Sequence, residues 1–168
     1  LHKTEAGGVC LDIPDRDAFD CAVTEMLAAV RAAVPAAQIE GVLVQPMCKG
    51  LAEAIIGYRH DPMVGPVVLV GMGGRLAEIY DDTAIACAPI DEAEALEMIV
   101  KVKGLALVRG YRGLPRGDVQ ALARAIVAVS RLALLAHQPI AEAEINPLMV
   151  RSDGVVAVDG LVVLRNAA

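Results

Sequence analysis

Short apolar runs separated by brief polar turns occupy the middle of this 168-residue chain. The runs at 51–58, 67–71 and 84–88 have the length and composition of β-strands. Strands that run parallel need a crossover of about a dozen residues or more, usually a helix. The first gap instead carries the polar, proline-punctuated residues 59–66, which read as a loop. The sequence therefore predicts antiparallel pairing of neighbouring strands.

Other segments add helices and further strands to this sheet. Capping aspartates predict helices from Asp15 or Asp17 to about Ala33, from Asp91 to about Val102, and from Asp118 to about Ala136. Further strands are expected at 9–13, 41–47 and 76–80, with a terminal hairpin in 141–160 and a turn or short helix at 104–110. The predicted fold class is α+β, a mainly antiparallel sheet with helices packed on one face.

Composition limits both the core and the partners. Apolar residues make up 56% of the chain and aromatic residues only 2%, so the core must consist of Ala, Val, Leu and Ile. The net charge is −6 without a Lys/Arg-rich stripe, which excludes a nucleic-acid partner because phosphate neutralisation needs clustered positive charge. The most apolar window, 125–136, is too short to cross a bilayer, so no membrane partner is expected.

The four cysteines at 10, 21, 48 and 87 form no CxxC pair and have no histidine at a metal-ligand spacing. We interpret them as reduced, buried thiols of a cytoplasmic protein. The chain opens Leu-His-Lys without an initiator Met, which suggests part of a larger protein.

Two carboxylates and an amide interrupt the apolar pattern of the terminal hairpin: Glu144, Asn146 and Asp159. Residues two apart on a strand share a face, so Glu144 and Asn146 point the same way. If Asp153-Gly154 forms the two-residue loop, Leu148 pairs with Asp159, which then lies diagonal to Asn146 on that face.

Three oxygen-bearing groups on one face would suit Mg²⁺, which takes one or two carboxylates together with water and nucleotide phosphate. An ordinary solvated face explains the same residues, and the spacing alone leaves both interpretations open.

Six segments, in order, resemble one known family: HKTEAGGV, GVLVQPM, EAIIGYRHDPMVGPVVLVGMGG, AEIYDD, RGYRGLPRGD and EAEINPL followed by VAVDG. They are similar to the ATP-grasp domain of NDP-forming acyl-CoA synthetases, which include ADP-forming acetyl-CoA synthetases and are related to the β subunit of succinyl-CoA synthetase. The resemblance implies a partial lid subdomain at 1–38, lacking the family's ATP-binding lysine strand, and a core subdomain at 39–168.

The same resemblance implies a metal and nucleotide site. Asn146 and Asp159 match Mg²⁺ ligands, with Glu144 as a further ligand or a carboxylate beside the phosphates. ATP or ADP would bind where Gln45, Pro46 and Met47 line the adenine pocket, with Val44 and Met47 as its apolar walls. Glu53 would face the same cleft.

Phosphoryl transfer is implied for the N-terminal end. His2 matches a histidine that relays the phosphoryl group, although at a chain end it can also be a plain terminal residue. Lys3, Gly7 and Gly8 match a loop that closes over phosphates, and a plain turn is the alternative.

Two further features stay ambiguous. Arg112 would bind phosphate or cap a helix end, and we expect either equally. The glycines at 71, 73 and 74 predict a tight turn between strands, because a dinucleotide fingerprint would have to open a helix.

The leading hypothesis is the nucleotide-binding part of a ligase that joins a carboxylic acid to CoA, inactive on its own. Its partners would be separate CoA-binding and ligase domains, an acyl-CoA or carboxylate substrate, and a second copy if the protein is a homo-oligomer. The alternatives are a catalytically silent regulatory module fused to an enzyme such as an acyltransferase, and an ATP-grasp ligase that joins a carboxylate to an amine.

Overall fold

The computed structural model describes residues 3–74, 82–135 and 140–165. The chain divides into two compact units, Leu1–Met47 and Cys48–Ala168. The assignment of 1–38 as lid and 39–168 as core stays a prediction. The expected strand at 76–80 lies outside the described residues.

The described residues of the first unit form one helix, α1 (Arg16–Ala33). It begins as predicted, because the Asp15 carboxylate accepts a hydrogen bond from the Ala18 N–H at 2.9 Å. No residue of α1 is fully buried. Its predicted apolar positions form a half-buried stripe: Phe19, Ala22, Val23, Met26, Leu27 and Val30.

The strands predicted at 9–13 and 41–47 are wrong, since both segments lack regular secondary structure. A strand forms only where a neighbouring strand supplies the other half of its backbone hydrogen bonds. Neither segment pairs with a strand among the described residues, so an apolar pattern alone did not produce one.

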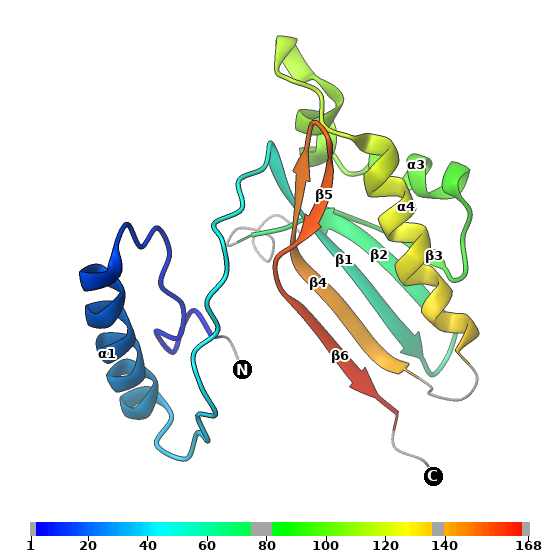
Figure 1. Ribbon diagram of the computed structural model, residues 1–168. Coiled ribbons are helices and arrows are strands. Elements are labelled where there is room, and N and C mark those ends of the chain that lie inside the picture. The colour runs from blue at the N-terminus through cyan, green and yellow to red at the C-terminus, as the bar shows by residue number, and fades with distance from the viewer. Residues whose placement is uncertain (1–2, 75–81, 136–139, 166–168) are drawn as a thin grey trace. The chain divides into compact units, whose positions relative to one another are not determined.

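The second unit is built on a six-stranded antiparallel sheet (Figure 1). Its strands are β1 (Ala52–Asp61), β2 (Gly65–Met72), β3 (Thr83–Cys87), β4 (Ile140–Arg151), β5 (Gly154–Ala157) and β6 (Gly160–Leu164). They lie in the order β3-β2-β1-β4, and β5 and β6 follow one another along the far edge of β4. The antiparallel prediction is confirmed. The loop predicted at 59–66 is shorter than expected, since Arg59, His60 and Asp61 continue β1 and pair with β2.

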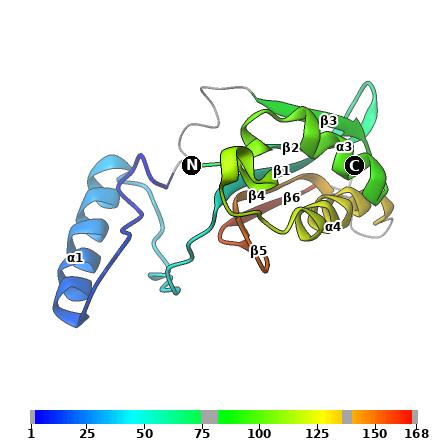
Figure 2. The same ribbon diagram turned by 90° about the horizontal axis from the view of Figure 1, so that it is seen from above.

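Two helices, α3 (Glu92–Lys101) and α4 (Val119–Ser130), cover one face of this sheet (Figures 1 and 2). Asp91 and Asp118 cap them as predicted. α4 is shorter than expected, because the chain tightens at Ser130 into a 3-10 helix, η3 (Arg131–Leu134). Two more 3-10 helices, η1 (Gly104–Arg109) and η2 (Tyr111–Gly113), link α3 to α4. No described helix is long and apolar enough to cross a membrane.

The core lies between the sheet and these helices and is almost purely aliphatic, as the composition predicts. Ile56 and Val70 from the sheet are fully buried with Leu105 of η1 and Ile126 of α4. Within this unit, no described helix covers the opposite face of the sheet, which we call the open face. Side chains that alternate with the core positions point to this face.

The predicted burial of the cysteines is wrong. All four are free, Cys10, Cys21 and Cys87 are exposed, and Cys48 is half-buried. Cys87 shows the reason, because it lies on the edge strand β3 and alternates with the inward-facing Ala84 and Ala86. It therefore points away from the core.

Ser130 is the one fully buried polar side chain among the described residues, and it yields a stability prediction. Its hydroxyl donates to the Val127 carbonyl at 2.8 Å and accepts from the Ile90 N–H at 3.2 Å. Ser130→Ala leaves the buried Ile90 N–H without that acceptor, which should lower the free energy of unfolding by about 1–3 kcal/mol. Urea unfolding measures this, with the exposed turn variant Ser152→Ala as the control. Equal stability of the two variants would contradict the prediction.

Candidate functional site

An irregularity in β4 marks the centre of the candidate site. Ala54 of β1 pairs with Leu148, whereas Ile56 pairs with Ile145, so β4 carries one extra residue between these points. The buried positions of β4 change accordingly, from Ala143 before the bulge to Leu148 after it. Asn146 and Pro147, joined by a cis peptide bond, lie where the strand changes register. Bulges of this kind re-aim side chains and are frequent beside functional sites.

The terminal hairpin has a different register from the one predicted. Arg151 pairs with Gly154, so the loop is 152–153 rather than Asp153-Gly154. Leu148 consequently pairs with Ala157, and Asn146 lies directly opposite Asp159 instead of diagonal to it. The Asn146 N–H donates to the Asp159 carbonyl at 3.1 Å. The structure thus brings the two predicted metal ligands closer together along the ladder than the predicted register did.

Glu144 and Asp159 provide the carboxylates of this region. Glu144 is half-buried and pairs with Gly57 on one side and Leu161 on the other. It points to the open face, because its neighbours Ala143 and Ile145 pack toward the helices. Asp159 is exposed at the break between β5 and β6, and its Oδ1 accepts from the Gly160 N–H at 3.0 Å.

Glu53 also reaches the open face, since it lies between the buried Ala52 and Ala54 near the start of β1. Its backbone carbonyl accepts from the Gly73 N–H at 2.8 Å. Its carboxylate occupies the space where a side chain on Gly74 would stand, and Gly74 has a left-handed φ of +79°. Only glycine suits this position.

Gly74 joins Glu53 to Asn146. The Gly74 N–H donates to the Asn146 side-chain oxygen at 3.3 Å, a contact between residues that are 72 positions apart. The backbone at Gly74 therefore lies against both side chains, which come from the central strand β1 and the bulge of β4. The sequence predicted only a tight turn for these glycines. The sequence feature that could have indicated a close backbone contact here is the presence of three glycines among residues 71–74.

The donors gathered here fit a hard cation. Asn146 offers a carboxamide oxygen. Glu144 offers a carboxylate two residues earlier on β4, and Asp159 offers one from the segment opposite Asn146. Among the described residues, no three His, Cys, Asp or Glu side chains gather as a metal cage. Mg²⁺ does not require such a cage, because it binds to one or two carboxylates and completes its shell with water and phosphate.

The N-terminal candidates form a separate turn in the first unit. The Gly7 N–H donates to the Thr4 carbonyl at 3.1 Å, and the Gly8 N–H donates to the Lys3 carbonyl at 2.7 Å. Gly7 has a left-handed φ of +71° and would meet Ala29 with any larger side chain. Both glycine amides are thus used inside the turn, so a phosphate could reach them only if it opened. His2 lies outside the described residues.

The remaining predicted residues lie on the surface. Val44, Gln45, Pro46 and Met47 belong to the first unit and are exposed, with Val44 at 65% and Met47 at 49%. Their assignment to an adenine pocket stays a prediction. Arg112 is exposed, has a left-handed φ of 50°, and stacks its guanidinium over the Tyr111 ring at 5.2 Å. No side-chain hydrogen bond caps η2, and neither predicted role of Arg112 is tested.

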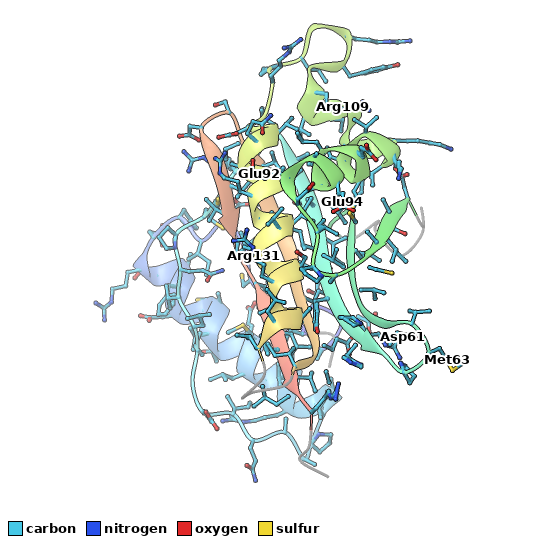
Figure 3. All side chains as sticks on the ribbon, turned by 90° about the vertical axis from the view of Figure 1, so that its right-hand side faces the viewer. Asp61, Met63, Glu92, Glu94, Arg109 and Arg131 are labelled. Atoms are coloured by element: carbon cyan, nitrogen blue, oxygen red, sulfur yellow. The ribbon has the colours of Figure 1, made fainter. Side chains whose placement is uncertain are left out.

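Among the described residues, the acid with a clearly perturbed pKa lies away from this site. Hydrogen bonds from the Met63 and Val64 N–H groups lower the pKa of Asp61, at the tip of the β1–β2 hairpin (Figure 3). Glu53 lies near the other end of β1. The lowered pKa of Asp61 therefore reflects the backbone hydrogen bonds of this turn and does not mark a catalytic acid of the candidate site.

The close contact between Gly73 and β1 gives a testable prediction. A Cβ at Gly73 would lie 2.6 Å from the backbone carbonyl of Ala54, so Gly73→Ala must push this segment off β1. Overpacking of this kind lowers the free energy of unfolding by about 1–3 kcal/mol. Gly41→Ala is the matched control, because nothing lies within 4 Å of its added Cβ. Calorimetric melting that fails to separate the two variants would contradict the contact.

Comparisons with known proteins identify the family of this domain. The ATP-grasp domain model matches residues 1–164 of the chain. The ADP-forming acetate–CoA ligase I of Archaeoglobus fulgidus is 40% identical over 164 residues, which are 98% of this chain and 24% of that protein. The β subunit of the ADP-forming acetate–CoA ligase I of Pyrococcus furiosus is 36% identical over 164 residues, 98% of this chain and 70% of the subunit.

Solved structures with a similar fold come from the same group of enzymes. The dinucleotide-forming acetyl-CoA synthetase 1 of Ca. Korarchaeum cryptofilum, in complex with coenzyme A, Ca-AMPCP and HgCl⁺, has a TM-score of 0.85 at 33% identity, covering 98% of this chain and 72% of that one. Its complex with coenzyme A and Mg-AMPPCP has a TM-score of 0.76 at 29% identity, covering 98% and 71%. The chain spans about a quarter of the Archaeoglobus protein. It belongs to the ATP-grasp family, in the form found in ADP-forming acetate–CoA ligases.

Proposed function

We propose that this chain is the nucleotide-handling part of an NDP-forming acyl-CoA synthetase. The whole enzyme would convert an acyl-CoA, phosphate and ADP into a carboxylic acid, ATP and CoA, or run the reverse reaction. The observation that carries the proposal is the meeting of Glu53, Gly74 and Asn146 on the open face of the sheet. The family match over residues 1–164 supports it.

Asn146 and Asp159 are the proposed ligands of Mg²⁺, and Glu144 is a third ligand or a carboxylate beside the phosphates. Mg²⁺, when bound, offsets the negative charge on the nucleotide phosphates. Asn146 is held by two contacts, its N–H to the Asp159 carbonyl and its side-chain oxygen to Gly74. These contacts hold the carboxamide oxygen in one orientation before the cation arrives, which lowers the entropic cost of binding.

The residues proposed to contact the nucleotide are those that the family resemblance implies. Val44, Gln45, Pro46 and Met47 would line the adenine, and Glu53 would also contact the nucleotide. Lys3, Gly7, Gly8 and Arg112 are proposed to contact phosphate oxygens. Phosphoryl transfer depends mainly on such positioning and charge neutralisation.

His2 is proposed to relay the phosphoryl group. A neutral imidazole nitrogen would attack the phosphorus of an acyl phosphate, forming an N–P bond as the bond to the carboxylate oxygen breaks. A terminal oxygen of ADP would then attack the same phosphorus and release the imidazole. The acyl phosphate has to form in CoA-binding and ligase domains, which are the proposed partners of this domain. A homo-oligomer and a cytoplasmic location belong to the same proposal.

Removal of the proposed ligands tests the metal assignment. In the full-length enzyme, Asn146→Ala with Asp159→Ala should weaken Mg·ADP binding at least about tenfold, the loss that even a change outside the ligand shell can cause. Isothermal titration calorimetry with Mg²⁺ and ADP measures this. Asp153→Ala is the matched control, because Asp153 is exposed in the same hairpin and pairs only with Arg151 among the described residues. Unchanged binding in the double variant would refute the assignment.

Activity of the isolated chain tests whether this domain needs the rest of the enzyme for catalysis. The 168-residue polypeptide alone should show no acyl-CoA-dependent ATP formation, because it spans only part of its relatives. Luminescent detection of ATP, with the full-length enzyme as the positive control, measures this. ATP formation by the chain alone would contradict the prediction. Mg·ADP binding without ATP formation in the full-length protein would instead favour a regulatory module.

A further inference from the structure

Asp82 holds the beginning of η1 against the beginning of β3. Its Oδ1 accepts from the Lys103 N–H at 3.0 Å, and its Oδ2 accepts from the Gly104 N–H at 2.6 Å. The first amides of a helix have no partner within the helix, and a carboxylate binds them with charge-assisted hydrogen bonds. Asp82 directly precedes β3, so one side chain ties the edge of the sheet to the helical layer.

Gly104 passes this constraint to Met72. A Cβ on Gly104 would overlap the Met72 side chain, and it would lie 3.4 Å from Asp82 Oδ2. Met72 therefore rests directly on the backbone that Asp82 holds. Met72 is half-buried and also packs against the core, so both Gly104 and the core hold its side chain in place.

Met72 lies between Gly71 and Gly73, in the segment that ends at the candidate site. A Cβ on Gly71 would lie 3.1 Å from the Asp82 carbonyl, so the two backbones touch at this point. The Gly73 N–H then donates to the Glu53 carbonyl. The next residue, Gly74, holds the Asn146 carboxamide. An unbroken series of contacts thus runs from Asp82 to Asn146.

We propose that Asp82 is a positioning residue for the metal site, although it is not itself a ligand. This inference rests on the proposed function of Asn146. Asp82 holds η1 in place, and η1 holds Met72. Met72 positions the glycine segment 71–74, and Gly74 of this segment orients the Asn146 side-chain oxygen. Loss of the Asp82 carboxylate should therefore weaken binding of a hard cation without removing any ligand.

The test uses Mn²⁺ as a spectroscopic substitute for Mg²⁺ in the full-length enzyme. Asp82→Ala should raise the Mn²⁺ dissociation constant, measured from the EPR signal of free Mn²⁺, about two- to tenfold, as changes along a chain of packed groups typically do. The matched control is Asp118→Ala. Asp118 is also half-buried and caps a helix by accepting from a backbone N–H, that of Ala121 at 2.8 Å, but it is not part of the series.

Both variants lose a helix cap, so a purely structural effect would be similar in the two. Binding is measured at a temperature where melting curves show each variant fully folded. Gly104→Ala supplies an independent variant, because it keeps Asp82 but displaces Met72, and it should weaken Mn²⁺ binding in the same direction. If Asp82→Ala does not fold, Asp82→Asn is compared with Asp118→Asn, and a smaller increase is expected only in the former.

Two results would overturn the inference, and they are distinguishable. If Asn146→Ala loses Mn²⁺ but Asp82→Ala binds it as tightly as Asp118→Ala does, Asp82 has no positioning role. If Asn146→Ala itself binds Mn²⁺ normally, the proposed metal site is wrong and the inference fails with it.

Discussion

Burial of one face of β1 under the helical layer is the interaction on which the rest of the structure depends. β1 is paired on both sides, with β2 and β4, and its Ala54 and Ile56 are fully buried. Because side chains alternate along a strand, this burial directs Glu53 and Gly57 to the open face. β2 and β4, which flank β1, turn their buried side chains toward the same helices. Glu53, one of the residues proposed for the site, is therefore placed on a central strand that is paired on both sides.

The candidate site lies where the sheet departs from regularity. β4 has its extra residue at Asn146–Pro147, and opposite this point the partner strand is broken between β5 and β6. A regular ladder would satisfy every backbone group and leave side chains in strict alternation. The bulge instead allows the Asn146 oxygen to reach Gly74, and the break places Asp159 at an exposed position. The regularly paired strands around them hold the bulge in β4 and the break between β5 and β6 in place.

Four aspartates show two different uses of this side chain, and their local sequences do not distinguish the two. Asp82, Asp91 and Asp118 direct carboxylate oxygens at backbone N–H groups that begin helices, and so contribute to the fold. Asp159 lies at a strand break opposite Asn146. Asp82 combines both uses. It holds the start of η1, and η1 in turn supports the segment 71–74 next to the candidate metal ligand Asn146. A carboxylate can thus serve a binding site through the packing of its neighbours.

The sequence by itself determined the features that depend on neighbouring residues. These are the antiparallel pairing of neighbouring strands, the aspartate caps of three helices, the aliphatic core, and the family resemblance carried by six ordered segments. The tertiary structure alone decided the hairpin register, the exposure of the cysteines, the missing strands at 9–13 and 41–47, and the bridge from Gly74 to Asn146. Each of these depends on which distant segment lies alongside, and periodicity within a segment does not contain that information.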